Sequence, residues 1–74
     1  MNEETVATAL ARAIRARRLA LGFSQDSFAD RIAMHRSYYA ALERGQRNMT
    51  LSTLGRLAQG LGCPISVLFI EADL

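Results

Sequence analysis

The sequence predicts an all-α domain of five short helices, and three observations support this prediction. Apolar residues recur at the three- and four-residue spacing of helices along most of the chain. Hydroxyl residues that suit helix starts precede two of these stretches, and glycines that suit helix ends follow three of them. With 74 residues, half of them apolar, the chain has the size of one compact domain and is too apolar to be disordered.

The first helix is expected over residues 5–21, with Gly22 as its C-terminal stop. Its apolar stripe consists of Val6, Leu10, Ala13, Ile14 and Leu21. Arg17 projects close to this stripe and Arg18 to its edge, where an arginine must be paired or must extend to solvent. Glu43 is the only acid that we expect the later helices to offer as a partner.

Residues 24–45 carry the strongest signal in the chain. Ser24 suits an N-cap, and Phe28, Ala29 and Ile32 then fall on one helical face. Residues 33–35 interrupt this pattern, and a new helical period begins at Arg36. Two short helices with so brief a join must cross at a steep angle, which is the geometry of a helix-turn-helix.

The second helix of this pair has two different faces. Tyr39 and Leu42 should face the core, with Tyr38 on a flank. The opposite face carries Arg36, Ser37, Ala40, Ala41 and Arg44. Small residues let a helix enter a DNA groove about 12 Å wide, and arginine and serine can reach base edges there. The pattern favours DNA binding over the alternative of an ordinary solvated face.

The remaining chain is expected to form a polar loop and two further helices. The loop, residues 44–49, holds two arginines and suits either DNA phosphate or an ordinary solvated turn. Thr50 caps the fourth helix and Gly62 ends it. Its apolar face consists of Leu51, Leu54, Leu57, Ala58 and Leu61.

The last helix, residues 64–71 with Pro64 in its first turn, has almost no polar face. Its apolar residues are Ile65, Val67, Leu68, Phe69 and Ile70. A terminal helix of this kind must be covered by more than its own small domain. We expect the same helix of a second copy as the cover, in a two-fold homodimer. The alternative is a groove of a different protein.

The charges are compatible with nucleic acid. The net charge is +2, all nine basic residues are arginine, and four of the seven acids lie at the chain ends. Arginine binds phosphate bidentately and reads guanine, so this bias suits DNA. A GC-rich genome is an equally good explanation of the arginine bias.

Several other function classes are disfavoured. No apolar run reaches the length of a membrane span, and the N-terminus lacks the order of a signal peptide, so a cytoplasmic protein is expected. Cys63 is single and distant from the single His35, which disfavours catalysis and metal binding. We therefore expect no catalytic residue, no metal, no cofactor and no small-molecule ligand.

Over residues 10–70 the chain resembles the Cro and phage-repressor type of helix-turn-helix protein. The matching positions are Ile14, Arg18, residues 22–25, Phe28, Ala29, Tyr39, residues 42–45, Thr50, Leu54, Leu57, Ala58, Leu61 and Gly62. The resemblance implies a five-helix, λ-repressor-like DNA-binding domain. One position departs from the pattern, because the turn residue that is often glycine is Ala33 here. Its φ must be negative, or about 1 kcal/mol of strain is stored there.

Within that family the chain is most similar to the controller proteins of restriction–modification systems. The similarity lies in residues 35–39 (HRSYY), 43–48 (ERGQRN) and 61–69 (LGCPISVLF). It implies a homodimer on tandem operators that activates its own gene and the endonuclease gene and represses them at higher concentration. The alternative is a phage-type repressor, or an antitoxin whose last helix binds a protein partner.

The resemblance also implies roles for individual residues. It makes Arg36 and Ser37 contacts to DNA bases, and it pairs Arg18 with Glu43. Contacts to the DNA backbone are expected from Ser24, Gln25, Tyr38, Arg44, Arg47 and Asn48. The dimer interface is expected at Ile65, Val67, Leu68 and Phe69. Asp26 and Asp30 are either a contact for RNA polymerase or, the more favoured alternative, an ordinary exposed acidic face.

Overall fold

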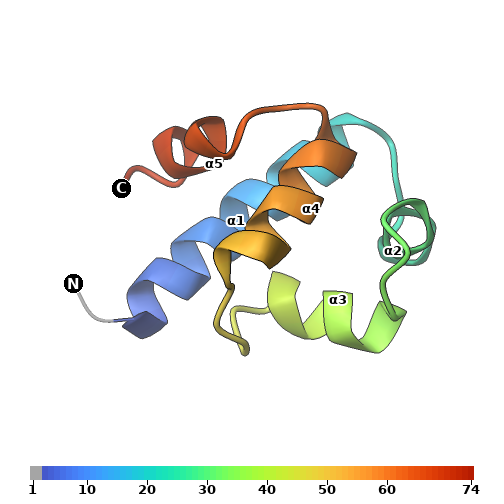
Figure 1. Ribbon diagram of the computed structural model, residues 1–74, viewed down its shortest axis with the longest axis horizontal. Helices are drawn as coiled ribbons and strands as arrows, with labels where there is room; N and C mark the ends of the chain where they lie inside the picture. The colour runs from blue at the N-terminus through green and yellow to red at the C-terminus, as the bar shows by residue number, and fades with distance from the viewer. Residues whose placement is uncertain (1–2) are drawn as a thin grey trace.

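The computed structural model describes residues 3–74, with side chains described from Val6 onward. It contains five helices and no strand in that range: α1 (Glu3–Ala20), α2 (Gln25–Arg31), α3 (Arg36–Glu43), α4 (Leu51–Leu61) and α5 (Ile65–Glu71). Figure 1 shows α1 and α4 at the centre, with α3 below them, α2 beyond one end of α4 and α5 on the opposite side. The predicted fold class is therefore confirmed.

The helix ends follow the capping chemistry that the sequence predicts. The Ser24 hydroxyl accepts a hydrogen bond from the Ser27 amide, and the Thr50 hydroxyl accepts one from the Thr53 amide. Gly22 and Gly62 adopt φ of 83° and 73°, the left-handed region in which glycine ends helices. Three bounds differ from expectation. The α1 helix begins at Glu3 and ends at Ala20, and Pro64 is the N-cap of α5 rather than part of its first turn.

All five helices contribute to one apolar core. Its largest fully buried side chains are Ile14, Phe28, Tyr39, Leu42, Leu57 and Leu68. Two leucines assigned to apolar stripes were predicted wrongly, because both Leu21 and Leu51 are exposed. Leu21 follows the last residue of α1, so the helical period no longer places it. Leu51 is the first residue of α4, and side chains there tilt beyond the helix N-terminus.

The join between α4 and α5 turns the chain sharply. Among residues 3–74 no single helix is both long and apolar enough to cross a membrane. Taken together, α4 and α5 have the length and composition for it, but the chain bends by 89° between them.

The turn between α2 and α3 is strained at Ala33. Its φ is +54°, so the second of the two expected alternatives holds, and the turn stores strain that a glycine would not. The Ala33 amide donates to the Asp30 carbonyl, and the Met34 amide donates to the Ala29 carbonyl. These bonds satisfy the last carbonyls of α2 and fix the turn in this conformation.

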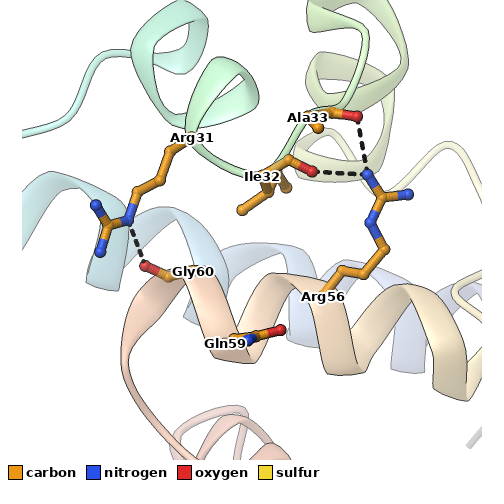
Figure 2. Close-up of a pocket in the computed structure, with 6 residues that line it drawn as sticks. All are labelled: Arg31, Ile32, Ala33, Arg56, Gln59 and Gly60. Carbon is orange, nitrogen blue, oxygen red and sulfur yellow. Dashed lines mark hydrogen bonds between the residues drawn. The ribbon is translucent and has the colours of Figure 1, made fainter.

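Two arginines tie α2 and its turn to α4 across an open cleft of about 530 Å³. Arg56 of α4 donates from Nη2 to the Ile32 and Ala33 carbonyl oxygens at 2.7 and 2.9 Å. Arg31 of α2 donates from Nε to the Gly60 carbonyl oxygen at 3.0 Å. Figure 2 shows the two guanidinium groups on opposite sides of Ile32, with Arg31 against one carbonyl oxygen and Arg56 against two. One arginine from each of α2 and α4 thus donates a hydrogen bond across the cleft, and Arg56 of α4 stabilises the strained turn.

Gly60 allows α4 to approach α2 closely. A Cβ added at this glycine would collide with Ile32 Cγ2 and would lie 3.1 Å from the Phe28 ring. Any larger residue would push α2 away from α4. The helix-turn-helix is therefore placed on the core by close packing as well as by the two arginine ties.

Candidate nucleic-acid interface

The α3 helix presents the two faces that its sequence predicts. Tyr39 and Leu42 are buried in the core, whereas Arg36, Ser37 and Arg44 are exposed. Tyr38, Ala40 and Ala41 are half-buried. Because α3 is anchored by two large buried side chains, its first turn is a rigid base for the exposed Arg36 and Ser37.

A buried ion pair connects α3 to α1. Arg18 donates from Nε to Glu43 Oε2 at 2.9 Å and from Nη2 to Glu43 Oε1 at 2.7 Å. Its Nη1 donates to the Phe23 carbonyl oxygen at 2.7 Å. The pairing that the resemblance implied is therefore present, and its bidentate geometry is the strong form of an arginine–carboxylate contact.

Arg17 does not compete for Glu43, because it has its own partner. Its Nη2 lies 2.6 Å from Glu71 Oε1. The expectation that Glu43 is the only available acid was wrong. Since α5 packs along α1, it brings a chain-end acid back against the first helix.

The surroundings of Glu43 change the titration of the groups around it. Burial by itself raises the pKa of Glu43, but the hydrogen bonds it accepts, led by those from Arg18, outweigh burial and leave its pKa below the ordinary value. The hydrogen bond to Glu43 raises the pKa of Arg18. Burial likewise raises the pKa of the Tyr39 hydroxyl, whose oxygen is buried without a hydrogen-bond partner. Both members of the pair are therefore ionised near neutral pH.

The same pair reaches the first turn of α2 through Gln25. The Gln25 Nε2 donates to Glu43 Oε1 at 3.1 Å. Three helices thus meet at one carboxylate, which fixes the angle of α2 against α3. The amide of Gln25 keeps a second hydrogen for an outside acceptor. Beside it, Ser24 is exposed, and its hydroxyl and backbone N–H are both engaged in the capping box with Ser27.

The loop between α3 and α4 is exposed and cationic. The guanidinium carbon of Arg47 lies 5.6 Å from the centre of the half-buried Tyr38 ring, a cation–π contact. Arg44 donates from Nε to Gln46 Oε1 at 3.0 Å, and Asn48 is exposed. Of the residues expected at the DNA backbone, the structure therefore brings Tyr38 and Arg47 together.

Sequence reasoning missed an ion pair between the first turns of α2 and α3. Arg36 Nη1 donates to Asp26 Oδ2 at 3.1 Å, and the two side chains are 76% and 66% exposed. For Asp26 the sequence indicates only a contact for RNA polymerase or an ordinary exposed acidic face. The signal that could have found the pair is the steep crossing of the two helices, which brings their N-terminal turns close together.

Comparison with known proteins identifies the family. A profile described as helix-turn-helix matches residues 14–68. The control protein C.MunI of a Mycoplasma species is 42% identical over 50 residues, which span 68% of this chain and 68% of that protein. The chain belongs to the helix-turn-helix family of controller proteins. As a member of this family, which is not a family of enzymes, it is a DNA-binding transcriptional regulator.

Solved structures of helix-turn-helix controllers share the fold. The restriction–modification controller protein C.AhdI from Aeromonas hydrophila matches with a TM-score of 0.82 and 34% identity, over 86% of this chain and 97% of that one. The restriction–modification controller protein C.Esp1396I, solved as a tetramer with its natural 35-base-pair operator, matches with a TM-score of 0.83 and 26% identity. The match covers 92% of this chain and 90% of that one.

The α5 helix of this helix-turn-helix protein differs from expectation at one position. Leu68 is fully buried in the core of its own protomer, so it cannot lie at an interface with another chain. An apolar helix must still seat one face on its own domain, and Leu68 with Ala72 forms that face. Ile65, Val67 and Phe69 are half-buried, and Ile70 is 73% exposed.

Cys63 and His35 are not part of a metal-ligand cluster among the described residues. Cys63 is half-buried and packs against the core. Within the described part of the chain, no three His, Cys, Asp or Glu side chains are placed to hold a metal ion.

Proposed function

We propose that this chain acts as a homodimer that places α3 of each protomer in successive major grooves of an operator. The supporting observation is the first turn of α3, where Arg36 and Ser37 are exposed on a helix whose other face is locked into the core by Tyr39 and Leu42. Helix-turn-helix dimers read half-sites about 10–10.5 base pairs apart, on one side of the duplex.

Arg36 and Ser37 are the proposed base contacts. A guanidinium offers paired N–H groups that match the O6 and N7 acceptors of guanine in the major groove, and a serine hydroxyl can pair with several base edges. Arg36 is 76% exposed, so its side chain can enter a groove without breaking any core contact. The half-buried Ala40 and Ala41 keep the following turn of α3 narrow.

The proposed contacts to the DNA backbone flank this helix on both sides. Gln25 is held by Glu43 and keeps one amide hydrogen for a phosphate, and Ser24 lies next to it at the start of α2. On the other side lie Tyr38 in the first turn of α3, Arg44 at its C-cap, and Arg47 and Asn48 in the following loop. Contacts of this kind position a protein on DNA and do not read its sequence.

The proposed dimer interface is α5, with Ile70 taking the place of Leu68. Ile65, Val67 and Phe69 are only half covered by their own protomer, and Ile70 is largely exposed. A two-fold arrangement would bury these side chains against their equivalents, since the same patch serves both copies. This interface would set the spacing between the two α3 helices.

The proposed biological role is control of a restriction–modification system in the cytoplasm. The chain would bind upstream of its own gene, activate at low concentration and repress at high concentration, with RNA polymerase as a further partner. The support is similarity to C.MunI and C.AhdI and the operator-bound tetramer of C.Esp1396I. We propose no membrane, small-molecule or cofactor partner.

The test is sedimentation of the purified protein, alone and with a duplex from the region upstream of its own gene. For a chain of 8.2 kDa, we expect the mass of a dimer and two successive DNA complexes. A scrambled duplex of the same length is the control and should form neither complex at the same concentration. A monomer would contradict the dimer, and equal binding of both duplexes would contradict autoregulation.

A further inference from the structure

The exposed pair of Arg36 and Asp26 lies at the tip of the proposed reading helix. It joins the first turn of α3 to the first turn of α2, and Gln25 and Ser37 are the chain neighbours of its two members. The pair lines a hollow of about 330 Å³ together with Asp30 and His35. An acid in this position is unexpected on a DNA-binding surface, because every phosphate of the duplex repels it.

The pair occupies only part of the Arg36 guanidinium. Among the described residues its single hydrogen bond runs from Nη1 to Asp26 Oδ2. A guanidinium has five N–H donors, so the edge formed by Nη2 and Nε stays unused. Two adjacent donors are what bidentate pairing with guanine O6 and N7 requires. Asp26 therefore orients the guanidinium from one side and leaves a guanine-reading edge on the other.

The charge of Asp26 affects matched and unmatched DNA differently. A free arginine at this position would bind a phosphate of any sequence, which raises non-specific affinity. With Asp26 beside it, the guanidinium is partly neutralised and the carboxylate repels the DNA backbone in every complex. Only a guanine at the right position offers two acceptors to the free edge and offsets that repulsion.

We propose that Asp26 is a specificity-determining residue, which holds Arg36 for base reading and penalises DNA that lacks the matching guanine. This inference rests on the proposed function of α3. Asp26 acts through Arg36 and through repulsion of the backbone, and it contacts no base itself.

The test compares Asp26→Asn with the wild-type protein on two duplexes. One is the best-bound duplex recovered from a random-sequence pool with the wild-type protein, and the other is the same duplex with its half-sites scrambled. We expect Asp26→Asn to bind the scrambled duplex more tightly than the wild-type protein does. Its gain in affinity for the selected duplex should be smaller. The ratio of the two affinities should fall about fivefold, the factor that one exposed charge contact in water supplies.

Asp30→Asn is the matched control. Asp30 lies one helical turn further along α2, is exposed, and has no side-chain partner within the described part of the chain. Its substitution removes the same charge, so it should strengthen binding to both duplexes by the same small factor. The ratio should stay at the wild-type value. Far-UV circular dichroism checks that both variants fold.

A double variant tests the dependence on Arg36. If Asp26 acts through this arginine, Asp26→Asn should no longer change the ratio in an Arg36→Ala background. A wild-type protein that binds both duplexes equally would contradict the proposed function itself. A wild-type protein that discriminates, with Asp26→Asn behaving like Asp30→Asn, would overturn only the role of Asp26.

Discussion

Two hydrogen-bonded arginine–carboxylate pairs hold α3, and they differ chiefly in burial. In the first, Arg18 and Glu43 are 2.7 Å apart and their side chains are 7% and 1% exposed. In the second, Arg36 and Asp26 are 3.1 Å apart and their side chains are 76% and 66% exposed. Buried charges need one another, because removing either leaves the other without water or a counter-ion. Exposed charges are solvated with or without a partner.

The same kind of ion pair therefore has two different roles on α3. The inner pair fixes the C-terminal end of α3 to α1 and α2, and contributes stability. The outer pair contributes little stability and leaves the Nε and Nη2 edge of Arg36 free to read a base. The following predictions test this division, from the largest expected effect to the smallest.

Replacing Glu43 by Gln should strongly destabilise the protein. The substitution leaves Arg18 buried without a counter-ion, and we expect the free energy of unfolding to fall by about 3–5 kcal/mol. Urea denaturation followed by circular dichroism measures it. The control is Glu71→Gln, which removes the partially exposed partner of Arg17 and should leave the urea midpoint nearly unchanged. Equal midpoints for the two variants would contradict the role assigned to the inner pair.

The same pair should make stability depend on pH in the acid range. The pKa of Glu43 is lowered in the folded protein from its ordinary value of 4.5, so the unfolded chain binds the proton more readily. The contribution of Glu43 is complete above pH 4.5 and is lost as the pH falls through the folded pKa. Urea midpoints between pH 7 and pH 3 should show this loss in the wild-type protein and a smaller one in Glu43→Gln.

Replacing Arg36 by Ala should weaken DNA binding without affecting the fold. We expect a loss of about 1–3 kcal/mol on the selected duplex and a smaller loss on the scrambled one, because a base contact is removed. Arg47→Ala is the matched control and should weaken both duplexes alike, with a salt dependence lower by about one phosphate contact. Equal losses on both duplexes for Arg36→Ala would remove Arg36 from the base-reading residues. Fluorescence anisotropy titrations at two salt concentrations measure these effects.

Relieving the strained turn should stabilise the protein. Ala33→Gly is expected to raise the free energy of unfolding by about 0.5–1 kcal/mol, because relief of the left-handed conformation exceeds the entropy cost of glycine. Ala40→Gly, in the regular helix α3, should have the opposite sign and cost about 1 kcal/mol. Thermal unfolding of both variants measures these changes in stability. A loss of stability in Ala33→Gly would mean that the strain at Ala33 is absent. The turn matters to the outer pair because it sets the position of α3 relative to α2.

The smallest effect is expected at the outer pair itself. Asp26→Asn should change the free energy of unfolding by no more than about 0.5 kcal/mol, since exposed ion pairs contribute little to stability. A loss comparable to that of Glu43→Gln, in the same urea experiment, would show that the outer pair is structural and would erase the contrast between the two.

The local pattern of the sequence was enough to place all five helices and most of their caps. Ser24 and Thr50 act through their side-chain hydroxyls, and Gly22 and Gly62 act through their backbone conformation. All four act on near neighbours, so their roles can be predicted from a few adjacent residues. The inward positions Tyr39 and Leu42 follow from the helical period alone. The pairing of Arg18 with Glu43 needed more, because the helical period places Arg17 closer to the apolar stripe than Arg18, and only the resemblance pairs Arg18 with Glu43.

Contacts between helices could not be predicted from the local sequence pattern, because they depend on how the helices pack. Leu68 and Ile70 are both apolar and two residues apart in α5, yet the core covers one fully and leaves the other 73% exposed. Glu71 reaches Arg17 because α5 folds back along α1, and Arg56 reaches the Ala33 carbonyl across the cleft to α4. The pairing of Asp26 with Arg36 depends on the angle between α2 and α3.

The sequence by itself therefore determined the all-α class, the helix-turn-helix and the exposure of Arg36, Ser37 and Arg44 on α3. These features depend on helical period and capping, which act over a few residues. Only the tertiary structure decided the sign of φ at Ala33, the burial of Leu68 and the partners of Arg17, Arg36 and Arg56. The physical reason is that such contacts join residues from 10 to 54 positions apart, whose distance is set by the packing of the whole domain.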